Sequence, residues 1–332
     1  MGLSDCADDR ELTHNPWFLL SISLQAVAGA ISAVVSSIVA WKCKCLHFHV
    51  NCRILIIALL MLYILHSVCI TILQVAQLAR YLLIPDACRV GLSLAVCFAL
   101  RLPPSACMVC FAFLQFAIVA ERGVALWKRE RYEKFGPFLG WSFTVISILI
   151  SIASTVYVAA DVDYEGDSVY CSTATDTTAE RVTAQGIGMC VVELIALAGM
   201  FALNIFNTMA IKKFTKFFRV QSYQLRENAS VIRLMLPLIV FQTLSYILFA
   251  AIDATIATVH MQLPYVTYRT LVASFYIIPY YTIVSPILLW YIIRWSQRLK
   301  ESKMKQLTRH NENERDVYFR TYIDMWNTRT KN

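Results

Sequence analysis

The stretch that decides the fold is Ile54–Leu78, ILIIALLMLYILHSVCITILQVAQL, which contains no Asp, Glu, Lys or Arg. An α-helix rises about 1.5 Å per residue, so about 20 apolar residues cross a hydrocarbon core of about 30 Å. Six further stretches are of similar length and carry at most one charged residue each. The predicted spans are Trp17–Ala40, Ile54–Leu78, Val90–Ala120, Pro137–Ala160, Ile187–Ile211, Leu234–His260 and Leu271–Ile293. We therefore predict an all-α membrane protein built as a bundle of seven transmembrane helices.

The Lys and Arg residues outside these spans fall almost wholly on alternate connections. Of the 29 such residues, 24 lie on the side that carries the tail after residue 293, and five lie on the opposite side. The opposite side is acidic, most clearly between the fourth and fifth spans, which hold Asp161, Asp163, Glu165 and Asp167. The positive-inside rule then predicts an N-terminus outside and a C-terminus in the cytosol. The net charge of +8 belongs to the inner face, so no nucleic-acid partner is predicted.

Three regions follow from this topology: an extracellular segment 1–16, a transmembrane domain 17–293 and a cytosolic tail 294–332. Residues 1–16 are polar and acidic and lack the basic and apolar regions of a cleavable signal, so we expect the first span to target and anchor the chain. In the tail, Arg294 and Arg298 alternate with apolar residues, which predicts a short amphipathic helix on the inner leaflet. Membrane lipid is thus one expected partner.

Four of the eleven cysteines lie on the oxidising side under this topology: Cys6, Cys88, Cys97 and Cys171. Four cysteines allow three connectivities. A Cys97–Cys171 disulfide is favoured, because it would join the outer end of the third span to the acidic loop over the mouth of a cavity. A Cys88–Cys171 disulfide is the alternative.

Three charged residues lie within the spans: Arg101, Glu193 and Asp253. A charge at the bilayer centre costs at least about 2.5–3.5 kcal/mol, so it normally faces protein or water and has a partner. Counted from the predicted outer ends, both acids lie roughly 9 to 10 Å deep, and Arg101 reaches a similar level. We expect the three to surround an outward-opening cavity of slightly negative charge. Three tyrosines are candidates to line the same space: Tyr246, Tyr276 and Tyr280.

Two alternatives stay open for Arg101. It either contacts a ligand or forms a salt bridge with one acid that only sets helix packing. In addition, Pro103 and Pro104 remove two backbone N–H donors, so the third helix is either kinked beside the cavity or begins at Pro103. In the second case Arg101 belongs to the rim.

Several short motifs occur at matching places along the chain: His47-Phe-His49-Val-Asn51 at the start of the second span, Glu121-Arg122, Tyr132-Glu133-Lys134, and Tyr223-Gln224-Leu225-Arg226-Glu227-Asn228 before the sixth span. This combination closely resembles the nematode serpentine chemoreceptors of the alpha superfamily, nearest class alpha/beta. The resemblance implies a G-protein-coupled receptor in the plasma membrane of sensory neurons, in their cilia, that detects a small environmental molecule.

The resemblance gives the cytosolic face a role in coupling to a heterotrimeric G protein. Glu121 would hold Arg122 until the sixth helix moves outward, after which the arginine would receive the C-terminal helix of the Gα subunit. The alternative is a solvated pair at a helix end. Further basic residues are candidates for the same contact, namely Lys212, Lys213, Lys216 and Arg226, although Lys212, Lys213 and Lys216 also suit anionic lipid.

Other classes of protein are less favoured. A transporter would show inverted repeats, and none is found; a seven-helix channel of the insect odorant-receptor kind places its N-terminus inside, opposite to the charge count. HExxH, GxSxG and paired catalytic carboxylates are missing, so no enzyme and no cofactor is predicted. Cys43 and Cys45 with His47 and His49 nearby lack the paired spacing of a zinc site, so no metal is predicted.

Overall fold

The computed structural model of this chain describes residues 3–43, 49–128, 132, 136–160, 162, 164, 166–173, 175, 177–214, 219–259, 262–295, 297–298 and 302. Side chains are described over these ranges except at residues 3–5, 87, 213, 214, 219–224, 226 and 227. The chain forms two compact units, Met1–Leu288 and Leu289–Asn332, and each is described by itself.

Seven helices in the described part of the chain are long and apolar enough to cross a membrane, as predicted from the sequence. They are Pro16–Cys43, Val50–Leu83, Leu94–Trp127, Phe138–Ala159, Ala179–Lys212, Asn228–Val259 and Tyr265–Trp295. Most are longer than the apolar runs, because a helix continues into its polar flanks where backbone hydrogen bonds still form. The seven-helix fold is thereby confirmed.

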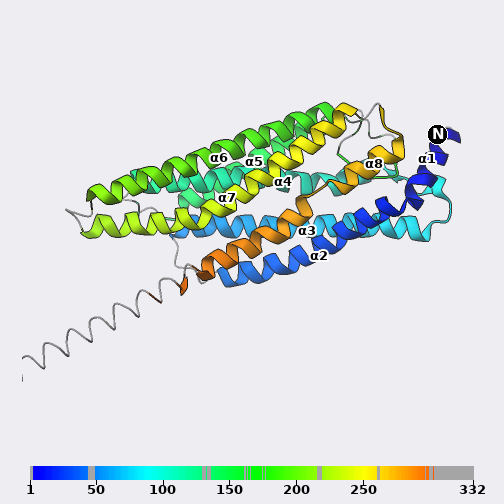
Figure 1. Ribbon diagram of the computed structural model, residues 1–332. Coiled ribbons are helices and arrows are strands. Elements are labelled where there is room, and N and C mark those ends of the chain that lie inside the picture. Colours follow the sequence, from blue (N-terminus) through cyan, green and yellow to red (C-terminus); the bar gives the residue numbers. More distant parts are fainter. Residues whose placement is uncertain are drawn as a thin grey trace, which may run out of the picture. The chain divides into compact units, whose positions relative to one another are not determined.

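The elements are shown in Figure 1. In chain order they are α1 (Leu3–His14), α2 (Pro16–Cys43), α3 (Val50–Leu83), η1 (Ala87–Arg89), β1 (Leu92–Ser93), α4 (Leu94–Trp127), α5 (Phe138–Ala159), β2 (Asp167–Ser168), α6 (Ala179–Phe214), α7 (Arg219–Val259) and α8 (Tyr265–Ser274). Residues 278–288 are also helical. We call the end of the bundle with α1 and α8 the α1 end, and the end where α6 finishes and α7 begins the α6–α7 end.

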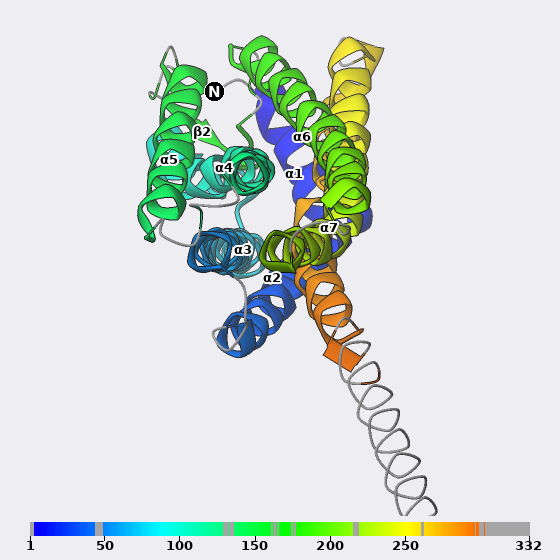
Figure 2. The same ribbon diagram turned by 90° about the vertical axis from the view of Figure 1, so that its left-hand side faces the viewer.

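Helix α4 has the most enclosed position. In its most apolar window 67% of the residues are buried, against 22–44% for the other spans. It contacts α3, α5, α6 and α7, and the view along the bundle in Figure 2 shows it among these helices. Polar side chains on α4 can therefore reach partners on several other helices.

The first turns of α4 correct one interpretation of the sequence. The helix begins at Leu94 and runs through Pro103 and Pro104, so it does not begin at Pro103. Two packing clusters hold these turns: Cys97 lies with Leu73 and Cys171, and Phe98 packs on the segment after α5. Because this packing fixes the segment before the prolines, the loss of two N–H donors does not end the helix.

Residues 1–16 form more structure than their polar composition indicated. Helix α1 begins at Leu3 and buries Leu12 against Phe18 and Tyr170. Two disulfides lie at this end of the bundle, Cys6–Cys88 and Cys97–Cys171, with Cα–Cα distances of 5.2 and 5.3 Å. Of the three possible connectivities, the structure therefore has the one in which Cys88 pairs with Cys6 of the N-terminal helix and not with Cys171.

Close packing of α2 on α3 depends on Gly29. A Cβ atom at this position would lie 2.5 Å from Thr71 Oγ1 and 3.0 Å from the carbonyl oxygen of Ser67. We expect Gly29→Leu to separate the two helices and to destabilise the receptor domain by about 1–3 kcal/mol. The melting temperature of the purified protein in detergent and its surface level in cells would both fall.

Gly188 on α6 provides the matched control. A Cβ atom there would meet no atom within 4 Å in the described structure. Gly188→Leu should therefore keep the melting temperature of the parent protein. Equal melting temperatures for the two leucine variants would show that the Gly29 contact does not limit stability.

Candidate ligand pocket and coupling site

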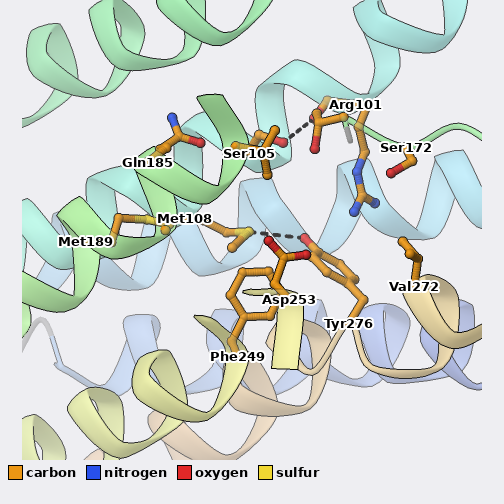
Figure 3. Close-up of a pocket in the computed structure, with 13 residues that line it drawn as sticks. Arg101, Ser105, Met108, Ser172, Gln185, Met189, Phe249, Asp253, Val272 and Tyr276 are labelled. Atoms are coloured by element: carbon orange, nitrogen blue, oxygen red, sulfur yellow. Dashed lines mark hydrogen bonds between the residues drawn. The ribbon is translucent and has the colours of Figure 1, made fainter. Parts of the chain in front are cut away.

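A pocket lies toward the α1 end, between α4, α6, α7 and the chain that follows β2 and α8 (Figure 3). It contains about 600 Å³ of empty space, including the part that is open to solvent. Its lining side chains include Arg101, Ser105, Met108, Ser172, Gln185, Met189, Phe249, Asp253, Val272 and Tyr276.

The structure brings together three of the residues predicted to line a cavity. Arg101 and Asp253 point into the same space from α4 and α7, and Tyr276 lies between them (Figure 3). The guanidinium carbon of Arg101 lies 4.3 Å from the centre of the Tyr276 ring. A cation over an aromatic face at this distance is attracted by the ring quadrupole.

Arg101 is 94% buried, since only 6% of its surface is exposed. Its Nε and Nη1 atoms have no hydrogen-bond partner among the residues that the structure describes. Within the same residues the ion pairs are Arg89–Asp86 and Arg122–Glu121, so Arg101 pairs with neither acid. The interpretation of Arg101 as one half of a structural salt bridge is therefore not supported.

The position of Glu193 corrects the expectation that three charges surround the cavity. Helix α6 begins at Ala179, so Glu193 lies about 21 Å along the helix, whereas Arg101 and Asp253 lie only about 10 Å from the nearer ends of α4 and α7. Glu193 is fully buried and lies about one turn beyond Met189, the last α6 residue of the pocket lining. The pocket therefore carries one positive and one negative side chain.

Glu193 is instead the centre of a buried polar cluster. Its carboxylate accepts hydrogen bonds from Gln242 Nε2 at 2.5 Å, from Gln115 Nε2 at 3.2 Å and from Thr243 Oγ1 at 3.4 Å. Tyr281 donates its hydroxyl hydrogen bond to Gln242 Oε1. We call these residues, with Tyr63, the middle cluster.

Tyr63 completes the middle cluster, because its hydroxyl lies 2.7 Å from that of Tyr281. No motif in the sequence predicted a role for Tyr63, Gln115, Gln242, Thr243 or Tyr281. The available signal was a glutamine inside each of two apolar spans, since an uncharged amide in a membrane helix also needs a partner. Such a residue indicates a buried contact but does not name the other side chain.

The two remaining tyrosine predictions are corrected as well. Tyr246 is buried and donates its hydroxyl hydrogen bond to the carbonyl oxygen of Met108 at 2.6 Å, so it braces α7 against α4 and is not part of the pocket lining. Tyr280 is 38% exposed and is also absent from the lining.

At the opposite, α6–α7 end, Glu121 and Arg122 form a buried ion pair. Arg122 Nε and Nη2 donate to the two carboxylate oxygens of Glu121, each at 2.5 Å. Glu121 is fully buried and Arg122 is 2% exposed. The alternative of a solvated pair at a helix end is therefore wrong for this structure.

Residues from the family-like motifs surround this pair. Arg122 Nη1 donates to Asn228 Oδ1 on α7 at 3.5 Å, and the Tyr132 hydroxyl donates to Glu121. The ring of Tyr132 lies 4.2 Å from that of His49, measured between centroids. Burial and the neighbouring Glu121 charge raise the pKa of the Tyr132 phenol, so it stays protonated and remains a donor. We call Glu121, Arg122, Tyr132 and Asn228 the coupling cluster.

Only one of the other predicted coupling residues has a described side chain. Lys212 is exposed near the end of α6. The side chains of Lys213 and Arg226, the residue Lys216, and the motif positions Cys45 and His47 lie outside the described residues, as does nearly all of the chain after Trp295, including the predicted amphipathic helix. Within the second unit, Arg294 lies 4.5 Å above the ring of Trp290.

Comparison with known proteins agrees with these features. The model of the family described as serpentine type 7TM GPCR receptor class ab chemoreceptor matches residues 4–327. The chain belongs to this family. It is similar to serpentine receptor class alpha-10 of Caenorhabditis briggsae, at 21% identity over 84% of each chain, and of Caenorhabditis elegans, at 22% identity over 97% of each chain.

Membership of the serpentine chemoreceptor family confirms the resemblance drawn from the motifs and fits a multi-pass membrane protein. In this family member three polar sites lie at successive levels along α4. The pocket lies toward the α1 end, the middle cluster follows, and the coupling cluster lies toward the α6–α7 end. Helix α4 contributes to each level, through Arg101, Gln115 and Arg122 in turn.

Proposed function

We propose that this serpentine receptor binds a small environmental molecule in the pocket around Arg101 and Asp253 and activates a heterotrimeric G protein at the coupling cluster. The observation that carries the proposal is the contact between Arg122 and Asn228, which joins α4 to α7 at the end opposite the pocket. A relative movement of α7 would break this contact and release the arginine. The buried ion pair then corresponds to the inactive arrangement.

A chain of contacts joins the pocket to the middle cluster, and it supports the proposal that ligand binding moves α7. Tyr276 in the pocket wall lies 3.4 Å from Met108 Sδ, and the carbonyl oxygen of Met108 accepts from Tyr246 on α7. The rings of Tyr246 and Tyr281 lie 6.1 Å apart, and Tyr281 donates to Gln242 in the middle cluster. A ligand that moves Tyr276 or Met108 would therefore act on α7 directly.

The test is expression of the whole chain with a promiscuous Gα subunit and a calcium readout against a chemically broad panel. A receptor should give ligand responses that require the Gα subunit. A ligand-gated channel or transporter would instead give a current that persists without any G protein. Such a current would overturn the proposal.

The orientation of the chain can be tested separately. Because Lys and Arg outside the predicted spans partition 24 to 5, we expect the N-terminus outside and the C-terminus in the cytosol. An epitope tag before residue 1 should bind antibody on intact cells, whereas a tag after Asn332 should bind only after permeabilisation. The reverse staining would exclude G-protein coupling at the Arg122 end.

Family membership also supports a location in the plasma membrane of sensory neurons, and we propose their cilia as the site of action. Fluorescent tagging of the full chain in such neurons would test this. Signal confined to the cell body would contradict a role in direct chemical detection.

A further inference from the structure

We propose that the pocket binds a small zwitterionic molecule, which presents a carboxylate to Arg101 and an amine to Asp253 across an apolar body. This inference rests on the proposed function, since it specifies the ligand of the same pocket. It follows from the charges that the structure leaves unpaired and from their places on different helices.

The carboxylate end is indicated by Arg101. A guanidinium group that is 94% buried normally has hydrogen-bond acceptors, because a buried donor without one costs about 1–3 kcal/mol. In the described residues, Nε and Nη1 have none, and the guanidinium lies against the Tyr276 ring beside the pocket. A carboxylate suits this guanidinium, because it can accept two parallel hydrogen bonds, from Nη1 and Nη2 or from Nε and Nη2, and either arrangement gives one of the two unpartnered donors an acceptor.

The amine end is indicated by Asp253. This side chain lines the pocket from α7, and it takes part in neither of the ion pairs formed by the described residues. An ionised carboxylate can only accept hydrogen bonds, so it requires a donor or a cation. A ligand amine would supply both.

The balance of charge separates a zwitterion from simpler ligands. Since Glu193 lies outside the pocket, the lining has a formal charge of zero, with its two charges on different sides. A plain amine would leave Arg101 unpaired, and a plain acid would leave Asp253 unpaired, at a depth where unpaired charge is costly. The lining also includes the apolar side chains of Met108, Met189 and Phe249, which suit a hydrocarbon body.

The test uses ω-amino acids, because their charge separation can be varied. Purified full-length receptor in detergent would be heated with 4-aminobutanoate, 6-aminohexanoate or 8-aminooctanoate, and with hexanoate or hexylamine as single-charge probes. The measured quantity is the shift in melting temperature, which reports binding without any G protein. At least one ω-amino acid should act at about tenfold lower concentration than either single-charge probe, as expected if each charge pair adds about 1.4 kcal/mol.

Two variants test which charged group of the ligand each side chain binds. Arg101→Gln should remove the advantage of the ω-amino acid over hexylamine, and Asp253→Asn should remove its advantage over hexanoate. Arg89→Gln and Asp86→Asn are matched controls, because these residues form an exposed ion pair at the same end of the molecule and should not change binding. If Arg101→Gln fails to fold, Arg101→Lys keeps the charge but loses the paired donors, and should weaken binding in part.

Three results would overturn the proposal. The first is no shift in melting temperature with any ω-amino acid, and the second is an equal shift with all five probes. The third is a preference for hexanoate or hexylamine that Arg101→Gln or Asp253→Asn leaves unchanged. Loss of G-protein signalling would not affect these measurements. Conversely, a receptor that couples to a G protein but ignores ω-amino acids would keep the proposed function and lose only the ligand class.

Discussion

Replacing Glu121 by glutamine is expected to raise ligand-independent signalling about tenfold. Glutamine keeps the size of the side chain, but it exchanges a charge-assisted, two-bond contact with Arg122 for a neutral one, a loss of about 1–1.5 kcal/mol. Because the arginine is buried in this arrangement, the loss favours its release. The measurement is basal G-protein signalling per receptor at the cell surface.

Two comparisons make this prediction specific. Glu180→Gln changes an exposed glutamate at the start of α6 and should leave basal signalling unchanged. Adding Arg122→Gln to Glu121→Gln should abolish the raised signal, because the released arginine is proposed to contact the Gα subunit. If the double variant still signals above the parent receptor, Arg122 does not make that contact.

The single change Arg122→Ala is a poor test of G-protein coupling, because it also affects the stability of the protein. Removing Arg122 leaves Glu121 buried, with the Tyr132 hydroxyl as its one remaining hydrogen-bond donor among the described residues, and breaking a buried pair from one side costs about 3–5 kcal/mol. We therefore expect Arg122→Ala to reduce the surface level as well as signalling. Surface staining of this variant checks that expectation.

The second prediction concerns Glu193 and Asp253, which the sequence had placed around one cavity. Neutralising these two acids should affect the melting temperature and the ligand potency differently. Glu193→Gln should lower the melting temperature, because the new amide N–H₂ faces the amide donors of Gln115 and Gln242 and leaves one of them without its acceptor. The expected cost is about 1–3 kcal/mol. Asp253→Asn should keep the melting temperature of the parent protein, since no ion pair is lost, but it should weaken ligand potency about tenfold.

Thermal unfolding of the two purified variants in detergent, together with dose responses in cells, measures both effects. Gln115→Glu provides a further check, because a second carboxylate beside Glu193 would repel it and lower the melting temperature again. Equal melting temperatures for Glu193→Gln and the parent receptor would contradict the role of Glu193 as the centre of the middle cluster.

The sequence alone determined the seven-helix fold and the family. Each apolar run is long enough to cross a bilayer, and a backbone in lipid must satisfy its hydrogen bonds within the helix, so run length is sufficient to predict a span. The combination of short motifs, above all Tyr223–Asn228 with Phe48–Asn51, predicted the serpentine family, which the match over residues 4–327 confirms. These features are local, so they do not depend on how the helices pack.

The level of each charge in the bundle was decided only by the tertiary structure. From the sequence, the depth of Glu193 was counted from Ile187, where the apolar run begins. Helix α6 in fact begins at Ala179, because the polar residues before the apolar run also form two helical turns. Those eight residues add about 12 Å and move Glu193 from the pocket to the middle cluster. Arg101 and Asp253 lie about 10 Å from Leu94, where α4 begins, and from Val259, where α7 ends, and both of these residues lie close to an end of the apolar runs.

Tertiary packing also chose the partners. Arg122 meets Asn228, 106 residues away, and Glu193 meets Gln115 and Gln242, 78 and 49 residues away. A sequence shows that a buried charge or amide needs a partner, but the partner depends on which helix faces which and at what height. Hydrophobic run length carries no information on either quantity, and for this reason the pocket, the middle cluster and the coupling cluster became visible only in the folded bundle.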